Sequence, residues 1–331
     1  MLRRPRRAPR NDISNHMEQQ IIGEKNNAAK YAFFYMLSLV ALIFMALSAG
    51  IIVFQIINKN IVDVLENFRG SYNSGSLKFA ISAIIIASPI YYLATAQISK
   101  NLFSGKLSKD SGIRKWLTYF ILLVSTIVML GFLIAVIYNF LDGELTTKFI
   151  LKALTAIIIA AAIFTYYLYD IKRENVAGVK DKTIRIYFYG SLVLVAAALI
   201  SAFVFVESPA ETRNIKYDSN ILNRFSQIDS ALNTYYYDNG KLPNDLDSML
   251  SGITYLREED MAEPATGKKF AYKVIDKNTY ELCATFKISS KDYENINGPY
   301  YFEKRWDHQP GYQCLRQKVR ADNIAPKSVA P

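Results

Sequence analysis

The sequence predicts an all-α membrane bundle of five transmembrane helices, followed by a small α+β domain. Apolar residues dominate the chain from Tyr31 to Val206, whereas residues 207–331 have the composition of an ordinary soluble domain. Basic residues are also distributed unevenly over the connections between the apolar segments, which is typical of membrane proteins with a fixed orientation. A chain of 331 residues is long enough for both domains.

Five apolar segments are long enough to cross a bilayer, whose hydrocarbon core needs roughly 20 residues per helix. The second is the most polar, and its Pro89 predicts a kink in a helix packed among neighbours. The first is too long for a cleaved signal peptide, although the small residues at 46–50 resemble a cleavage site. The transmembrane domain is therefore predicted at 31–207, with spans at 31–57, 79–96, 117–140, 149–169 and 186–206.

The positions of the basic residues predict the orientation. Three regions are rich in lysine and arginine, and they alternate with two poorer connections, after the first and third segments. Because basic connections stay in the cytoplasm, we expect a multi-pass plasma-membrane protein with a disordered cytoplasmic tail at 1–30 and an extracytoplasmic carboxy-terminal domain. The basic regions contain Arg3, Arg4, Arg6, Arg7, Arg10, Lys25 and Lys30; Lys100, Lys106, Lys109, Arg114 and Lys115; and Lys172, Arg173, Lys180, Lys182 and Arg185.

The cysteines agree with this orientation. Cys283 and Cys314 are the only two, and both lie in the domain expected outside. A disulfide forms in an oxidising compartment, so we expect these residues to be bonded. The alternative is a pair of buried free thiols.

The carboxy-terminal domain is predicted at 219–318, between a linker at 208–218 and a disordered tail at 319–331. Apolar residues recur at helical spacing from Ile221 to Tyr236, with Asp218 or Ser219 as the candidate cap and Asn239-Gly240 as the stop signal. A short helix is expected at 246–250. Two strands follow at 270–275 and 280–287, joined by a hairpin turn at 276–278.

Residues 30–174 resemble an uncharacterised bacterial integral-membrane domain, which is catalogued as a domain of unknown function. The phrases that carry this resemblance include IIVFQIINKNIVDVLE, LKFAISAIIIASPIYYLATAQI and RKWLTYFILLV. The order of the helices and the tryptophan-bearing connection also match the family's pattern. The resemblance implies no activity.

Residues 218–315 resemble the globular head of the type II secretion major pseudopilins, which are relatives of type IV pilins. The phrases are IDSALNTYYYDNGKLPNDLDSML, EPATGKKFAYKV and YELCATF. The resemblance implies a helix packed on a short antiparallel sheet, and a secretion-type or pilus-type envelope partner. The chain departs from the family because its fifth segment has no Gly-Phe-Thr-Leu-x-Glu cleavage phrase, so the resemblance leaves processing and filament assembly open. Only Asp292 and Glu294 are candidates for a calcium loop.

The spans contain almost no ionisable residue, which disfavours proton-coupled transport. Neither histidine, His16 or His308, lies in a span, so paired-histidine haem ligation is excluded. Asp307-His308 is either half of a zinc site or, as we expect, part of an aromatic lid with Trp306 and the aromatic residues at 300–302. Most of the net charge of +10 lies in the membrane connections, so we expect no nucleic-acid partner; the arginines near the amino terminus instead suit contact with anionic lipid.

No catalytic motif is present, and the carboxylates at 258–260 with Glu263 suit a solvated surface better than a glycosidase. The favoured function is a non-enzymatic membrane protein, without a cofactor, that presents its head to a protein or polymer partner. One alternative is a transporter or channel subunit formed by the bundle. Another is a membrane enzyme that uses Asp142 and Glu144. The sequence sets no oligomeric state.

Overall fold

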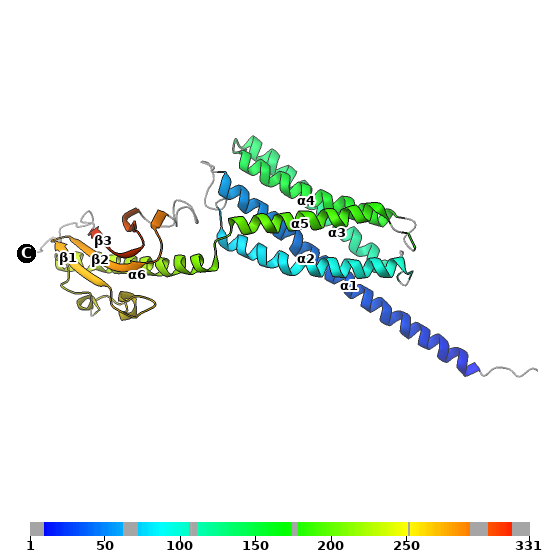
Figure 1. Cartoon of the computed structure of the whole chain (residues 1–331), viewed down its shortest axis with the longest axis horizontal. Coiled ribbons are helices and arrows are strands. Elements are labelled where there is room, and N and C mark those ends of the chain that lie inside the picture. The colour runs from blue at the N-terminus through cyan, green and yellow to red at the C-terminus, as the bar shows by residue number, and fades with distance from the viewer. Residues whose placement is uncertain are drawn as a thin grey trace, which may run out of the picture. The chain divides into compact units, whose positions relative to one another are not determined.

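The computed structural model describes residues 10–61, 72–105, 107, 111–173, 178–179, 181–250, 252–291 and 304–319, with only the helical backbone for 10–28. The chain divides into two compact units, Met1–Val206 and Glu207–Pro331. Figure 1 shows that the first unit is helical and that the second combines a helix with a sheet.

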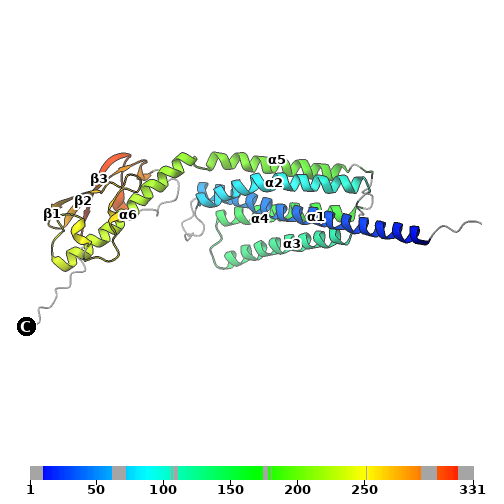
Figure 2. The ribbon, with the colours of Figure 1, turned by 90° about the horizontal axis from the view of Figure 1, so that it is seen from below.

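The first unit is a bundle of five helices in the described residues, each long and apolar enough to cross a membrane. Helix α1 packs mainly against α2, and α3 against α4. Figure 2 shows α3 and α5 at opposite edges of the bundle. The five predicted spans are confirmed as helices, all but one longer at both ends than expected: α1 (Arg10–Asn60), α2 (Ser74–Phe103), α3 (Gly112–Leu141), α4 (Thr147–Lys172) and α5 (Lys182–Phe205).

All five helices of the bundle begin earlier than the sequence predicts. Helix α1 begins at Arg10, so part of the tail expected to be disordered is helical. Helices α2, α4 and α5 begin after residues whose side chains accept hydrogen bonds from the first turn, namely Asn73, Thr146 and Asp181. These caps explain why the helices extend past the apolar segments.

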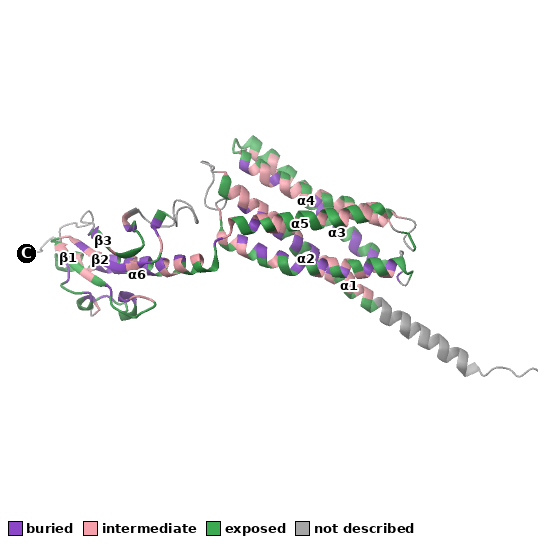
Figure 3. Cartoon of the chain, in the orientation of Figure 1, coloured by how far each residue is buried: buried purple, intermediate pink, exposed green. Residues whose placement is uncertain are grey.

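The inside of the bundle is small, and most of its apolar surface faces outward. Ile52, Leu77 and Ile84 are fully buried between α1 and α2. Large apolar side chains on α3 and α5, such as Ile134 and Val204, are more than half exposed, and Figure 3 shows these helices largely as exposed surface. Such a surface suits a lipid environment, because water would make its exposure costly.

The second unit contains one long helix, short 3-10 turns and a three-stranded sheet. Helix α6 (Pro209–Asn239) packs on β1 (Ala271–Asp276), β2 (Thr279–Phe286) and β3 (Gly311–Lys318), which form an antiparallel sheet in the order β1-β2-β3. The turns are η2 (Asp247–Met249), η3 (Glu258–Met261) and η4 (Lys304–Trp306). Phe225 of α6 lies at the centre of the core, where its ring contacts those of Phe270, Phe286 and Trp306.

The predicted hairpin of β1 and β2 is confirmed, but the start of α6 was predicted too late. Ser208 accepts a hydrogen bond from the N–H of Glu211, and Pro209 occupies the first turn, so the residues expected as a linker are helical. Asp218 is therefore not a cap. It lies inside α6, fully buried, and accepts hydrogen bonds from the backbone N–H groups of Lys287 and Ile288 at 2.8–2.9 Å.

The other end of α6 is as expected. Gly240 adopts a φ of +67°, which glycine tolerates best, and donates its N–H to the carbonyl of Tyr236.

The disulfide between Cys283 and Cys314 is confirmed. The two cysteines lie opposite one another on β2 and β3. The bond lies on the face of the sheet that points away from α6, because Leu282 and Leu315, their neighbours in the strands, contribute to the core. The disulfide therefore fixes the pairing of β3, a strand that the sequence analysis did not predict.

A buried polar cluster connects the inner face of the sheet to α6. The hydroxyl of Tyr280, a fully buried side chain, donates a hydrogen bond to Asp229 of α6, and Arg305 Nη1 lies 2.5 Å from the other oxygen of the same carboxylate. Burial and the adjacent carboxylate raise the pKa of Tyr280 well above its ordinary value.

This cluster predicts a specific loss of stability at high pH. A raised pKa means that the folded head keeps a proton that the unfolded chain loses above about pH 10. The stabilisation is therefore complete below that pH and is lost above it, by about 1.4 kcal/mol per pH unit. Tyr280→Phe should reduce the slope of the unfolding free energy against pH in this range, as measured by urea unfolding. Tyr237→Phe, at a side chain that is 49% exposed, is the control. Equal slopes in the wild type and in Tyr280→Phe would contradict this account.

Candidate functional site

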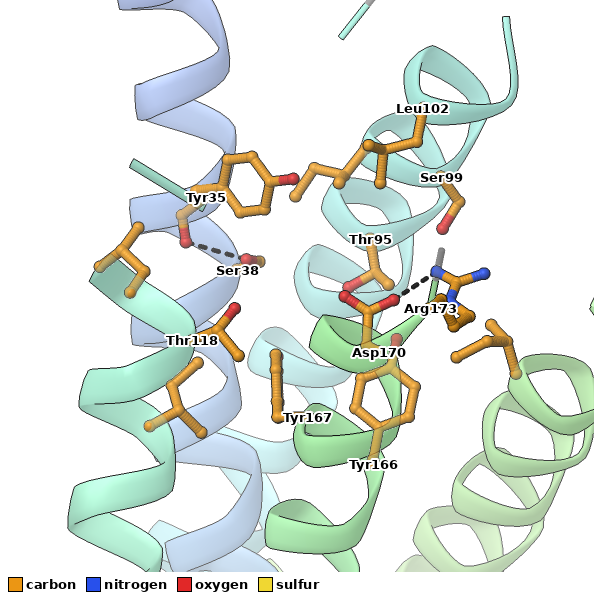
Figure 4. A pocket seen from close by; sticks show the side chains of 14 residues that line it. Tyr35, Ser38, Thr95, Ser99, Leu102, Thr118, Tyr166, Tyr167, Asp170 and Arg173 are labelled. Carbon is orange, nitrogen blue, oxygen red and sulfur yellow. Dashed lines mark hydrogen bonds and ion pairs between the residues drawn. The ribbon is translucent and has the colours of Figure 1, made fainter. Parts of the chain in front are cut away.

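A polar cavity lies at one end of the bundle, the end at which α2 and α4 finish and α3 and α5 begin. Its volume is about 50 Å³. Residues of all five helices line the cavity, so the site exists only when the bundle is assembled (Figure 4). It is lined by Tyr35, Ser38, Thr95, Ile98, Ser99, Leu102, Leu117, Thr118, Ile121, Tyr166, Tyr167, Asp170, Arg173 and Ile184.

A network of charged side chains forms the wall of the cavity next to α4. Arg114 of α3 is 3% exposed, and its Nη2 lies 2.8 Å from both the carboxylate and the main-chain carbonyl of Asp170. Arg173 pairs with the other carboxylate oxygen of Asp170, and Figure 4 shows the two side chains pointing toward one another. The carbonyl of Asp170 belongs to the last turn of α4, where it has no partner within the helix. Arg114 therefore joins the start of α3 to the end of α4.

Asp181 extends this network to α5. Its carboxylate accepts a hydrogen bond from Tyr169 at 2.9 Å and from the N–H of Thr183 at 2.8 Å, and Arg173 lies 3.8 Å away. Burial raises the pKa of Asp181, but these hydrogen bonds outweigh burial and lower it overall. With Arg114, Asp170 and Arg173, the network has no net charge, which reduces the cost of placing it at the membrane.

Two polar atoms next to the cavity are buried without a hydrogen-bond partner among the described residues. They are the Tyr35 hydroxyl and Arg173 Nε. Figure 4 shows the Tyr35 ring extending from α1 toward α2. Buried polar groups are normally paired, so a donor that faces a cavity without a protein partner is suited to bind a water or a ligand. The arrangement can bind a hydrogen-bond acceptor.

The sequence analysis missed this site because it placed the span boundaries too far inward. It began the third span at residue 117 and ended the fourth at 169, which counted Arg114, Asp170 and Arg173 as parts of the connections. Tyr35 and Tyr166, near the ends of the first and fourth spans, also line the cavity. The sequence does contain a signal for this site. Asp170 follows a pair of tyrosines at the end of one helix, and Arg114 lies at the start of the helix that packs against it.

The candidate site residues that were predicted from the sequence do not line this cavity. Asp142 and Glu144, the candidate catalytic pair, are both exposed after the end of α3. His308 is buried, stacks on Phe286 at 3.9 Å between ring centroids, and has its Nδ1 2.9 Å from the carbonyl of Trp306. These contacts support the structural interpretation of His308. The calcium candidates, Asp292 and Glu294, and residues 300–302 lie outside the described residues.

The carboxylates near η3 take part in local contacts. Asp260 accepts a hydrogen bond from the N–H of Arg257, and Glu258 and Asp247 lie 3.4 and 2.7 Å from Lys269. Glu263 accepts a hydrogen bond from Thr266 at 2.8 Å. Among the described residues, no group of three or more histidine, cysteine, aspartate or glutamate side chains is arranged to hold a metal ion.

One family model, Domain of unknown function (DUF5671), matches residues 31–167. This match confirms an uncharacterised domain over the first four helices, and it includes the cavity residues of α1, α2 and α3. No curated protein matches the chain, and no solved structure matches it. The chain is thus a multi-pass membrane protein by its helices, with an activity that these comparisons leave open.

Proposed function

We propose that this protein is a non-enzymatic membrane protein whose bundle anchors a pseudopilin-like head on the extracytoplasmic side of the membrane, where the head binds a protein or polymer partner. The observation that carries this proposal is the difference between the two faces of the sheet. One face is covered by α6, and the other carries the disulfide and exposed side chains.

The face of the sheet that points away from α6 carries exposed side chains that suit a binding surface. Tyr312 is 63% exposed, and it lies on the same face as Cys314 and Arg316 because these residues alternate along β3. Arg316 pairs with Glu281 of β2 at 2.8 Å. Exposed tyrosine and arginine are the residues that most often carry binding energy in protein interfaces. The disulfide at Cys314, between them on the same face, holds the surface rigid, which reduces the entropy lost on binding.

The orientation is part of the proposal. Five spans are an odd number, so the tail and the head lie on opposite sides of the membrane. The basic tail and basic connections favour the cytoplasm for the amino terminus. A disulfide between the only two cysteines is the chemistry of an oxidising compartment.

Photo-crosslinking in intact cells tests this function. A photoreactive phenylalanine at position 312 should form a product of higher mass, and mass spectrometry should identify one partner protein or polymer in it. The same residue at position 255 is the matched control, because Tyr255 is 56% exposed and lies near α6, where its hydroxyl is 3.2 Å from Thr234. Absence of a product at 312, or the same products at 255, would refute a partner on the sheet face.

A transporter or channel subunit is the second candidate, and the buried network of Arg114, Asp170 and Arg173 favours it. Buried ionisable residues within a membrane bundle often mark a substrate or ion pathway. If the bundle transports a solute, then proteoliposomes with the full chain should show flux that Asp170→Asn abolishes. If no flux is seen for a panel of ions and small polar solutes, the transport function is rejected and the first function is the one that stays.

A further inference from the structure

An apolar groove lies between α1, α3 and α4, nearer the middle of the bundle than the polar cavity. Its volume is about 260 Å³, and its lining is almost entirely hydrocarbon. Leu47 and Phe120 in its walls are 61% and 40% exposed, so the groove opens on the outer surface of the bundle. It is lined by Leu39, Leu42, Ile43, Ala46, Leu47, Gly50, Ile51, Phe54, Phe120, Ile121, Val124, Ser125, Val128, Phe132, Ala156, Ile159, Ala160 and Ile163.

Small residues on two facing helices create the hollow. Ala46 and Gly50 lie one turn apart on α1, and Ala156 and Ala160 lie one turn apart on α4. A Cβ atom at Gly50 would meet Ile159 Cδ1 at 3.8 Å, which is an ordinary contact, so the helices have not closed on one another there. Small residues in membrane bundles usually allow close approach of helices, but here they leave space.

The groove and the polar cavity are neighbours. Ile121 of α3 lines both. Along α1, Tyr35 and Ser38 line the cavity, and the residues from Leu39 onward line the groove. The order is the same on α4, where Tyr166 and Tyr167 belong to the cavity and Ile163 and Ala160 to the groove. From the end of the bundle toward its middle, the lining therefore changes from polar to apolar.

This order of polar and apolar lining matches the order of headgroup and acyl chain in a membrane lipid. Within the part of the chain that the structure describes, the Tyr35 hydroxyl and the Nε atom of Arg173 are buried without hydrogen-bond partners, and both suit the acceptor oxygens of a phosphodiester or a glycerol ester. The hydrocarbon lining suits an acyl chain, and the exposed walls give that chain access from the surrounding bilayer. A soluble polar solute would fit the cavity but would leave the groove empty.

We propose that the cavity and the groove together form a binding site for one phospholipid. Its headgroup oxygens lie near Tyr35 and Arg173, and one of its acyl chains lies in the groove between α1, α3 and α4. The site belongs to the bundle, so it does not depend on the function proposed for the head.

The acyl-chain part of the proposed lipid site is tested with the full-length protein in nanodiscs. These contain phosphatidylglycerol with a photoreactive diazirine in one acyl chain. Illumination should label peptides of α1, α3 and α4 that line the groove more strongly than the exposed peptides of α5. Ala46→Phe should fill the groove and reduce this labelling about tenfold, which corresponds to about 1.4 kcal/mol. Ala197→Phe, at an exposed alanine of α5, should leave the labelling unchanged.

The headgroup half is tested with the same lipid. Tyr35→Phe removes one hydrogen-bond donor and should reduce groove labelling about fivefold, in line with the usual strength of such a bond. Tyr138→Phe, at a side chain that is 65% exposed on α3, is the control and should label like the wild type.

Three results would overturn the proposal. Equal labelling of the groove in Ala46→Phe and Ala197→Phe would mean that no chain occupies it. Crosslinks between two copies of the protein through the groove, in place of lipid adducts, would mean that a second copy occupies it. Inorganic phosphate should not displace the lipid; if millimolar phosphate abolished labelling, the site would belong to a free anion instead.

Discussion

Replacing Arg114 by alanine is expected to destabilise the bundle by about 3–5 kcal/mol, because it removes one partner of a buried ion pair. Arg114 is 3% exposed and donates to both the carboxylate and the carbonyl of Asp170. Its loss leaves the last turn of α4 without that cap and leaves Arg173 as the remaining partner of Asp170. The measurement is the thermal unfolding of the purified full chain in detergent, followed by circular dichroism at 222 nm.

Arg185→Ala is the matched control, because Arg185 is an exposed arginine near the start of α5. It should unfold like the wild type. The double variant Arg114→Met, Asp170→Leu removes both charges and fills their volume, so it should recover most of the stability lost in Arg114→Ala. If Arg114→Ala and Arg185→Ala unfolded at the same temperature, the joining of α3 and α4 by Arg114 would be wrong.

Removing the disulfide is expected to destabilise the head by about 3–4 kcal/mol. The bond joins residues 31 positions apart, and the loop that it closes restricts the unfolded chain. The unit 207–331 has its own apolar core around Phe225, so we expect it to fold when it is produced alone. Urea unfolding of this unit with Cys283→Ala and Cys314→Ala, compared with the oxidised wild type, measures the effect.

Chemical reduction of the wild-type head is a second route to the same state. It should lower the urea midpoint as much as the double substitution does. If the double variant were as stable as the oxidised head, hydrogen bonding and packing alone would hold β3 on the sheet. The disulfide would then have no structural role.

The spans could be predicted from the sequence because hydropathy over about 20 residues is a strong and local signal. The helix ends could not, because they depend on single caps and on partners elsewhere in the chain. The start of α6 shows this: Ser208 and Pro209 begin the helix, but Arg213 and Lys216 make its first turns too polar for the apolar pattern to be seen.

The third strand and the candidate site needed three-dimensional information. The segment Gly311–Lys318 is rich in polar residues and poor in the β-branched residues that favour strands, so it is a strand because Cys314 and Leu315 pair with β2. The cavity joins residues from all parts of the bundle, and Arg114 and Asp170 are 56 positions apart. No local pattern relates two such residues, and each of them alone is an ordinary charged residue at a membrane boundary.

The central claim is that the bundle crosses the membrane five times and leaves the head outside. Labelling of intact cells with a membrane-impermeant maleimide tests it, because Cys283 and Cys314 are the only cysteines in the chain. We predict no labelling before reduction, since both are bonded, and labelling of both after treatment with an impermeant phosphine reductant. Thiols that react only after the cells are lysed, without any reductant, would mean that the head lies in the cytoplasm.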